Sequence, residues 1–561
     1  MTTTVPSLPH DYYVANFHTL AGFVAATYHD LLTPAELAWY ESIAAASINA
    51  QRLYIRLLTR RGSTFRLSRL AYPEIGDLIA AAEELSRAGL SLAHPLEDLN
   101  VLLACYTKPE IVQLLDLQTS KMLPRAELVE LILSADKPAC IRYIKRLGSQ
   151  DSWVTPLGHP HWMLFQLCFF GNLYQDSSEF VVAQLGTHRY ENYPLDKQAR
   201  AFTSRAQIEA HWRYYECDVL YESLDKHDSN TLLEFSASLP LAHRDDLDLQ
   251  RRVDRLRIKI ARQLERLSCF EPAVELYRQS INPPARERIA RIFMQDKQWD
   301  KALSVAQAIS NEPKSEHERQ SALRLLAKCQ QALGQPYKRQ TVYKPQTQKL
   351  VLRDDGLRVE EQARRFYARQ GECFHSENTL VAGVFGLFIW DILFHPISGV
   401  FFNPYQAAPV DYKQPEFHTR RADLFEERFL LLDDKTRFGA HIHEAFVQHH
   451  GKLNPLVHWR GLSEPLLSMA IDRIPLKHWR ALFDRLLLDV SEHSTGLPDL
   501  VWFPAKGGYE FIEIKGPGDA LQAHQRRWMQ YFDQHAIACR LVHIRYRAQA
   551  PIEQDSHELD S

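Results

Sequence analysis

The sequence has 561 residues and a mass of 65.0 kDa, more than a single hydrophobic core usually organises, so we expect two to four domains. Its 45% hydrophobic and 24% charged residues are ordinary for a globular protein, and the net charge of -3 excludes a protein that is basic throughout. Any surface that binds nucleic acid must therefore be local.

The cysteines and the apolar stretches exclude further classes of protein. The eight cysteines never approach a CxxC spacing, which argues against a zinc ribbon or a disulfide framework. Residues 1–17 lack a basic segment followed by an apolar run, so we expect no secretory signal and a cytoplasmic location. The most apolar stretch, Leu380 to Trp390, is too short for a membrane span and is expected to be a buried helix. No membrane partner is expected.

Residues 1–99 are predicted to form a helical region that binds DNA. Apolar residues recur here at helical spacing, and the stretch 40–72 holds six arginines and one acid. Arg52, Arg56 and Arg60 would line one face of a helix, because side chains four residues apart are neighbours on its surface. Such a row of arginines can follow a phosphate backbone. The alternative is a solvated helix face paired with acids from elsewhere.

Residues 100–150 are predicted to form a helical hairpin, with one helix over 109–117 and a second that begins near Pro124. Proline suits the first turn of a helix. The hairpin resembles the SAP module, a small DNA-binding unit, although an ordinary helical hairpin within a larger α domain is the alternative. Its candidate DNA contacts are Lys108, Lys121 and Arg125.

Residues 151–340 are expected to form helical repeats. Ala261 and Phe270 recur 29 positions later as Ala290 and Trp299, which indicates stacked helix pairs. The pattern resembles tetratricopeptide repeats, although their usual period is about 34. Such a solenoid provides a concave surface or a rigid spacer. Residues 341–356 lose the helical pattern, and we expect a linker there.

Residues 357–549 are predicted to form an α/β domain, whose main signal is GLPDLVWFPAKGGYEFIEIKGPGD, from Gly496 to Asp519. Two apolar runs, 500–503 and 509–514, flank a turn that contains two glycines, which predicts an antiparallel hairpin. Side chains alternate along a strand, so Glu513 and Lys515 share one face. Asp499, at the start of the first strand, can then lie near Glu513.

This convergence suits the hydrolysis of a phosphodiester. Carboxylates provide the oxygen ligands that Mg²⁺ prefers, and the cation can neutralise developing charge and generate hydroxide near neutral pH. Asp499 and Glu513 fit the role of ligands. Lys515 can orient the attacking water or help to deprotonate it. The alternative is a surface hairpin with an exposed ion pair.

The strings GLPDLV and EIKGPGD, followed by Gln525 and Trp528, resemble the virus-type replication-repair nuclease (VRR-NUC) domain of the PD-(D/E)xK superfamily. The resemblance implies that Asp499, Glu513 and Lys515 are catalytic. It also implies that the backbone carbonyl of Ile514 binds the metal. Asp519 is a candidate for a further metal ligand or for a hydrogen bond that orients one, and Gln525 is a candidate for a hydrogen bond to the site.

HSENTLVAGVFGLFIWDILF, residues 375–394, resembles the helix that opens this domain in the Fanconi-associated nuclease family. Ser376 is expected to cap the helix and to place Glu377 in its first turn. The resemblance implies that Glu377 is a catalytic metal ligand. Without it, Glu377 is an acid favoured by the helix dipole.

The order of modules also matches this family, so the expected fold is a mostly α-helical N-terminal two thirds followed by an α/β PD-(D/E)xK nuclease domain. The resemblance implies a DNA nuclease of the phosphodiesterase I type, acting as a 5′ flap endonuclease and 5′ to 3′ exonuclease in interstrand crosslink repair. Branched or flapped DNA is then the partner. Mg²⁺ or Mn²⁺, with two ions at the site, is the implied cofactor.

The sequence departs from eukaryotic members, because it lacks the Cys and His ligands of their ubiquitin-binding zinc finger. It resembles a bacterial-type member, for which we expect no ubiquitin partner and a location at the nucleoid. Two alternatives remain open. The same fold can act on RNA or on phosphodiesters in general, or the chain can be an inactive repeat scaffold.

Overall fold

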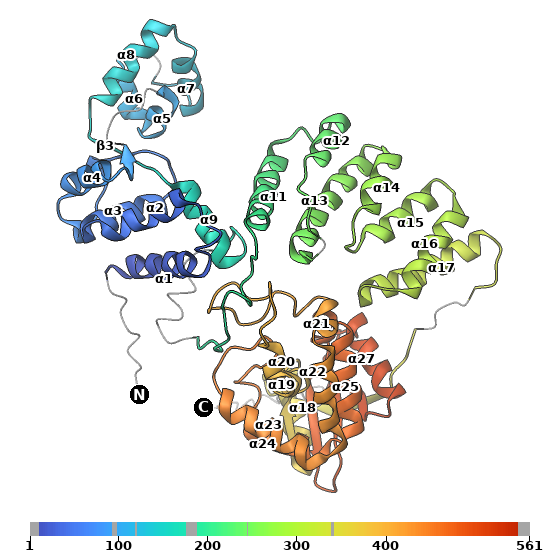
Figure 1. The fold of residues 1–561 in the computed structure, drawn as a ribbon. Helices are drawn as coiled ribbons and strands as arrows, with labels where there is room; N and C mark the ends of the chain where they lie inside the picture. Colours follow the sequence, from blue (N-terminus) through green and yellow to red (C-terminus); the bar gives the residue numbers. More distant parts are fainter. Residues whose placement is uncertain are drawn as a thin grey trace, which may run out of the picture. The chain divides into compact units, whose positions relative to one another are not determined.

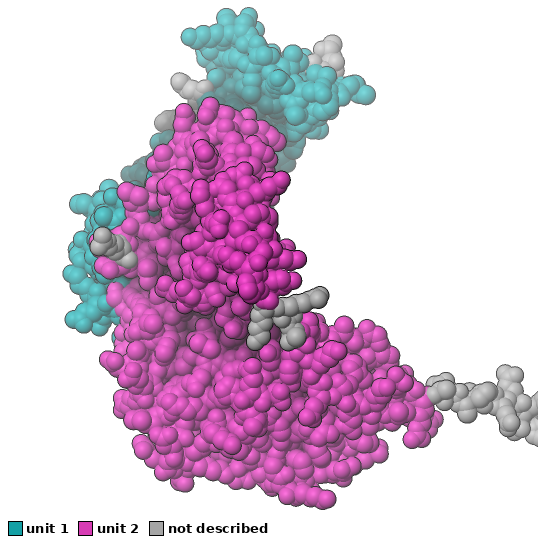
Figure 2. Space-filling view, turned by 90° about the vertical axis from the view of Figure 1, so that its right-hand side faces the viewer, with its two compact units in different colours: residues 1–187, 194–216 teal, residues 188–193, 217–561 magenta. Residues whose placement is uncertain are grey.

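The computed structural model describes residues 10–92, 98–117, 121–175, 188–243, 245–337 and 342–547. The chain divides into two compact units, coloured separately in Figure 2. The first consists of Met1–Thr187 with Pro194–Glu216, and the second of His188–Tyr193 with Cys217–Ser561. Among the described residues, no helix has both the length and the apolarity to span a membrane.

The first unit begins with a helical module that includes a small antiparallel sheet. In this sheet β3 lies between β1 and β2. Helix α1 contacts α2, α3 and α9. The elements are α1 (Tyr12–Thr27), α2 (Pro34–Ala45), α3 (Ile48–Leu58), β1 (Phe65–Arg66), α4 (Leu78–Arg87), β2 (Ser91–Leu92), β3 (Trp153–Pro156) and α9 (His159–Phe170).

A second helical module is inserted between β2 and β3, with its own core around Leu102, Ile111 and Leu128. The predicted hairpin helices are present, but two more helices complete the module. They are α5 (Leu99–Ala104), α6 (Lys108–Leu114), α7 (Arg125–Leu133) and α8 (Lys137–Gly148). The expectation that the repeats begin at residue 151 is wrong, because β3 returns to pair with β1 and β2 of the first module.

Where the sequence predicts repeats, the second unit contains a row of helices, which Figure 1 shows in green and yellow-green. Successive helices from α12 to α17 pack on one another. The repeated alanines, Ala261, Ala273, Ala290 and Ala302, are all fully buried, which explains why small residues recur there. The helices are α12 (Ser229–Ala237), α13 (Leu247–Arg266), α14 (Phe270–Arg278), α15 (Ala285–Gln295), α16 (Trp299–Asn311) and α17 (Glu316–Ala332), preceded by α11 (Arg205–Ser223).

The last part of the chain forms a five-stranded mixed sheet in the order β4-β8-β7-β6-β5. The predicted hairpin is confirmed, because β6 and β7 pair antiparallel with Leu500 opposite Ile512. The expected linker 341–356 is wrong in part, since β4 lies within it and pairs in parallel with β8. The strands are β4 (Thr347–Leu352), β5 (Gly371–His375), β6 (Leu500–Pro504), β7 (Glu510–Lys515) and β8 (Cys539–Tyr546).

Helices cover the sheet and continue between β5 and β6. Ala363 and Tyr367 of α18 pack on Ile512 and Ile514 of β7. The two isoleucines therefore anchor β7 in the core. The predicted helix near 380–390 is confirmed as α19, which is buried throughout. The helices are α18 (Val359–Tyr367), α19 (Leu380–Phe388), α20 (Trp390–Leu393), α21 (Glu416–Thr419), α22 (Ala422–Phe429), α23 (Lys435–His449), α24 (Glu464–Arg473), α25 (Leu476–Leu488), α26 (Val490–His493) and α27 (Ala523–Gln534).

Candidate active site and DNA-binding surface

The candidate active site lies where β5, β6 and β7 meet. The backbone N–H groups of Ser376 and Glu377, just after β5, donate to the carbonyl oxygen of Asp499 at 2.8 and 3.3 Å. The hydroxyl of Ser376 donates to the carbonyl of Pro498 at 3.1 Å. On the other side of Asp499, the backbone N–H of Ile514 donates to its Oδ2 at 2.7 Å. Three separate segments of the chain are therefore joined at this aspartate.

Glu513 and Lys515 extend from β7 as an ion pair. Lys515 Nζ lies 2.7 Å from Glu513 Oε1, and the two residues are only 8% and 1% exposed respectively. Asp499 is 9% exposed. Glu513 Oε1 is buried against the ammonium of Lys515, although the angles of this contact are not those of a hydrogen bond. A buried carboxylate oxygen in this position is suited to accept a cation.

Burial shifts the protonation of both acids in the same direction. Desolvation raises the pKa of Glu513 to about 8, and the neighbouring Asp499 raises it further while Lys515 opposes the shift. Desolvation likewise raises the pKa of Asp499 to about 6, although the N–H of Ile514 lowers it. Glu377 contributes to the rise at both acids, so it lies within electrostatic range of them. The site concentrates negative charge that a divalent cation would neutralise.

The position of Glu377 differs from the expected one. Helix α19 begins at Leu380 with Thr379 at its cap, so Ser376 is not the cap and Glu377 precedes the first turn. The hydroxyl of Ser376 is used by Pro498 instead, because β5 ends directly against the segment that leads into β6. Glu377 is exposed, and its carboxylate accepts from Asn378 Nδ2 at 3.4 Å. The helix dipole is therefore not what places this acid.

The described residues contain no group of three or more His, Cys, Asp or Glu side chains that could by itself hold a metal ion. Glu377, Asp499 and Glu513 consequently do not form a closed protein cage. Mg²⁺ commonly takes only one or two carboxylates and completes its coordination with water and phosphate oxygens. Asp499 and Glu513 are adequate for such an open site.

Asp519 and Gln525, the two candidates for supporting the site, each accept a hydrogen bond from a backbone N–H group nearby in the sequence. Asp519 Oδ2 accepts from the N–H of Gly516 at 3.0 Å, which closes the turn after β7. Gln525 Oε1 accepts from the N–H of Gln522 at 3.0 Å and so caps α27. The sequence analysis missed Glu360 on α18, which raises the pKa of Asp499 from a distance. Its only signal in the sequence is its place in a run of charged residues.

The arginines of the first unit are not the single helical stripe that the sequence predicts. Arg52 pairs with Asp11 at 3.0 Å and Arg56 with Glu74 at 3.0 Å. Arg60 lies beyond the end of α3 at Leu58, where the chain turns. Arg52 and Arg56 therefore fit the alternative interpretation, in which the helix face is paired with acids from elsewhere in the sequence.

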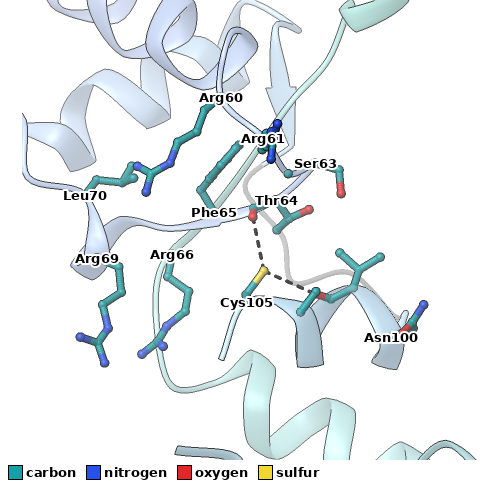
Figure 3. Close-up of a pocket in the computed structure, with 13 residues that line it drawn as sticks. Arg60, Arg61, Ser63, Thr64, Phe65, Arg66, Arg69, Leu70, Asn100 and Cys105 are labelled. Carbon is teal, nitrogen blue, oxygen red and sulfur yellow. Dashed lines mark hydrogen bonds between the residues drawn. The ribbon is translucent and has the colours of Figure 1, made fainter. Parts of the chain in front are cut away.

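Arg60 and three arginines that were not among the sequence-based candidates line a pocket of about 400 Å³ between the loop after α3 and helix α5, drawn in Figure 3. None of its lining residues, all within the described ranges, is acidic. Glu110 reaches Arg66 and Arg69 from outside, at 2.8 and 2.5 Å. The arginines at the pocket are Arg60, Arg61, Arg66 and Arg69.

The candidate cations of the inserted module differ in their surroundings. Arg125 donates to the carbonyl oxygens of Leu103 and Tyr106, each at 3.0 Å, and so closes the end of α5. Lys121 is exposed, and Lys108 is half-buried at the first position of α6. Arg125 therefore has a structural role whether or not DNA is bound.

Comparison with known proteins places these features in a family. Two family models match the chain, FAN1, HTH domain over residues 11–91 and VRR-NUC domain over residues 434–545. A Fanconi-associated nuclease 1 homolog from Pseudomonas aeruginosa is 34% identical over an alignment of 556 residues, and the match covers 96% of this chain and 97% of the relative. A homolog from Arabidopsis thaliana is 24% identical and covers 92% of this chain and 65% of its own length.

Two solved structures match 97% and 96% of this chain. A crystal structure of paFAN1 bound to 2nt 5'flap DNA with gap matches with a TM-score of 0.80 and 32% identity, over 97% of this chain and all of that one. A second, with a 1nt 5'flap, matches with a TM-score of 0.77 and 31% identity. With 34% identity across 96% of its length and the same fold, the chain belongs to the Fanconi-associated nuclease family.

Proposed function

We propose that this protein is a divalent-metal-dependent nuclease that cuts branched DNA near a 5′ flap, degrades DNA from 5′ to 3′, and acts in interstrand crosslink repair. Membership of the family supports a nuclease, and the 5′ flap DNA in the two related structures supports this class of substrate. The observation that carries the proposal is the meeting of β5, β6 and β7 at Asp499, beside the buried pair of Glu513 and Lys515. Such a nuclease would work at the nucleoid of a bacterial cell.

The catalytic roles follow from the chemistry of each group. Asp499, Glu513 and the carbonyl of Ile514 would hold Mg²⁺ or Mn²⁺, with Glu377 as a further ligand and two ions at the site. The cation, when bound, supplies Lewis-acid stabilisation of the phosphate and lowers the pKa of water. Lys515 would orient the attacking water from its position beside Glu513. Asp519 and Gln525 would support the site through the turn and the helix cap that they stabilise.

The DNA would lie across cations of the first unit. Arg60, Lys108 and Lys121 are proposed to contact phosphates, and the acid-free pocket at Arg60 favours an anion. Arg52, Arg56 and Arg125 already bond within the chain, Arg52 and Arg56 to acids, so they would contribute less to phosphate binding than Arg60, Lys108 and Lys121. Measuring the affinity for DNA at several salt concentrations separates these two groups of cations. The slope of the logarithm of affinity against the logarithm of salt concentration falls by roughly 0.9 for each phosphate contact to duplex that is lost.

Cleavage of end-labelled substrates tests the proposed activity. Flapped, nicked and single-stranded DNA and a matched RNA are incubated with Mg²⁺, with Mn²⁺ and with EDTA. We expect cutting near the flap that requires the metal, and loss of at least about 100-fold in turnover in Asp499→Asn, since a ligand is removed. Asp533→Asn, an exposed aspartate on α27, is the matched control.

Two results would replace the proposal. Equal cleavage of the RNA would favour a nuclease of the same fold with a broader substrate. An absence of cleavage on every substrate, with DNA binding retained, would favour a repeat scaffold without activity.

A further inference from the structure

A cleft of about 840 Å³ opens in the first unit between α1, α3 and α9. Pockets that bind small ring-containing molecules are typically about 300–1,000 Å³, so a nucleotide fits this volume. None of the sixteen lining residues is acidic, and all lie in the described part of the chain. The cleft is therefore both large and free of negative charge on its walls.

The floor of the cleft is aromatic. Phe17 of α1 and Trp162 of α9 stack with ring centroids 5.1 Å apart at 28°, and both are buried. Tyr12 and Met163 are half-buried at its sides. Phe17 and Trp162 use their ring faces on each other, so the surface on which a planar ring can stack is that of Tyr12 and Met163.

Polar groups surround this floor. Gln166 is half-buried on α9 and His159 is exposed at the start of the same helix, and both line the cleft. An amide and an imidazole can donate and accept hydrogen bonds at the edge of a planar ring. An apolar floor with a few polar groups at its edge is the usual composition of a site for an aromatic ligand.

The rim of the cleft carries positive charge. Arg60, Arg61 and Gly62 line both this cleft and the smaller pocket of Figure 3, so they form a ridge between the two hollows. Arg60 donates to the hydroxyl of Tyr72 at 3.1 Å, whereas Arg61 forms no ion pair within the described residues. Arg56 also reaches the cleft, but Glu74 neutralises it.

We propose that this cleft binds an unpaired base of single-stranded DNA, with the neighbouring phosphates on Arg60 and Arg61. A stacked base in a duplex is not available to such a site, whereas bases of single strands stack on aromatic side chains while arginines follow their backbone. An uncharged apolar ligand would not account for the arginine ridge. The inference rests on the proposed function, because branched DNA is what supplies unpaired bases.

The test places 2-aminopurine, whose fluorescence is quenched by stacking, at successive positions of the flap and of a single-stranded gap in a flapped duplex. Binding is measured in EDTA so that no cleavage occurs. We expect quenching at one position or two adjacent ones. Replacing the bases at those positions by abasic sites should lower the affinity on the order of tenfold.

Two variants locate the effect. Tyr12→Ala removes a wall of the cleft, and Thr59→Trp fills it from an exposed position at its edge. In both variants we expect the 2-aminopurine fluorescence to be restored. The difference in affinity between normal and abasic DNA should disappear. Thr19→Trp is the matched control, because Thr19, like Thr59, is an exposed threonine whose hydroxyl donates to the carbonyl four residues earlier.

Failure of this inference differs from failure of the proposed function. Quenching at no position, or quenching that both variants leave unchanged, would overturn the cleft as a base-binding site while flap cleavage persists. The control variant Thr19→Trp should cleave flapped DNA within about twofold of wild type. Loss of the proposed function would instead appear as an absence of metal-dependent cleavage in the wild type.

Discussion

Asp499 and Glu513 hold protons at pH values where most carboxylates are ionised. Burial raises the pKa of Asp499 to about 6 and, with the additional effect of Asp499, that of Glu513 to about 8. A divalent cation binds the ionised form of each acid, so metal and proton compete for the same oxygens. The affinity of the site for metal is therefore linked to pH.

The first prediction concerns this linkage. Burial raises the pKa of both acids, whereas the cation binds their ionised forms, so binding of Mn²⁺ at pH 7 should release protons. Calorimetric titration in two buffers of different ionisation enthalpy measures the release. The apparent affinity for Mn²⁺ should rise with pH up to about 8. Glu513→Gln should lose most of the proton release, and an absence of release in the wild type at pH 7 would contradict the assignment.

The same shifts predict how stability depends on pH without metal. Both pKa values are raised in the folded protein, so the folded state binds more protons than the unfolded state between about 4 and 8. The contribution of these acids to stability is therefore present at low pH and is lost as the pH rises through about 6 and about 8. Melting curves in EDTA should show this loss, and Mn²⁺ should raise the melting temperature more at pH 8 than at pH 6.

The third prediction tests Glu377 as a ligand. Glu377→Gln should lower turnover at least about 100-fold at low Mg²⁺, with partial recovery at high Mn²⁺, because the substitution removes only the charge. The melting temperature should change little, since Glu377 is exposed. Glu372→Gln is the matched control, an exposed glutamate on β5 of the same segment. Near-normal turnover of Glu377→Gln at low Mg²⁺ would limit the site to Asp499, Glu513 and Lys515.

At the scale of elements, the β6–β7 hairpin could be predicted because its signals are local. Two alternating apolar runs flank a turn with Gly507 and Gly508, and both glycines adopt a positive φ. Asp499, Glu513 and Lys515 then follow from the register of a hairpin. The buried helix α19 is equally local, since apolar residues fill every side of it.

The remaining features depend on contacts between distant parts of the sequence. The sequence of β4 resembles a linker, because the strand with which it pairs, β8, lies almost two hundred residues later in the chain. Arg52 and Arg56 form a periodic stripe, but their acids, Asp11 and Glu74, have no local relation to them. Glu377 is placed by backbone bonds to Asp499 and not by a helix. A pattern of neighbouring residues contains none of this information.

The fourth prediction concerns the turn that precedes Asp499. Gly496 has φ +81°, and a Cβ there would lie 2.2 Å from His524 Cδ2 on α27. Gly508 has φ +80° with no heavy atom within 4 Å of the same position. Gly508→Ala should therefore show only the backbone cost, about 1–2 kcal/mol, in urea unfolding. Gly496→Ala should cost more and should also lower turnover, because α27 must move beside the site. Equal effects in both variants would show that the contact with His524 is unimportant.

At the scale of the molecule, residues His188–Tyr193 belong to the second unit while the chain on both sides belongs to the first. Glu191 anchors this segment, since its Oε2 accepts from Trp390 Nε1 at 2.9 Å and lies 2.9 Å from His449 Nδ1. Lys452 Nζ donates to both carboxylate oxygens. Tyr193 stacks on Phe401 at 4.0 Å. The second unit thus holds residues 188–193, and from Pro194 the chain again belongs to the first unit.

The last prediction measures the strength of this anchor. Glu191→Ala leaves the half-buried charge of Lys452 without its partner, and removal of one member of a buried ion pair costs about 3 kcal/mol or more. The N–H of Leu453, which donates to the carbonyl of Arg189 at 2.7 Å, reports locally on the segment. Its hydrogen exchange should become on the order of 100-fold faster, whereas exchange in β6 and β7 should not change. Glu191→Gln keeps an acceptor for Trp390 and should have a smaller effect. Unchanged exchange at Leu453 in Glu191→Ala would mean that Tyr193 and the backbone hold the segment without the ion pair.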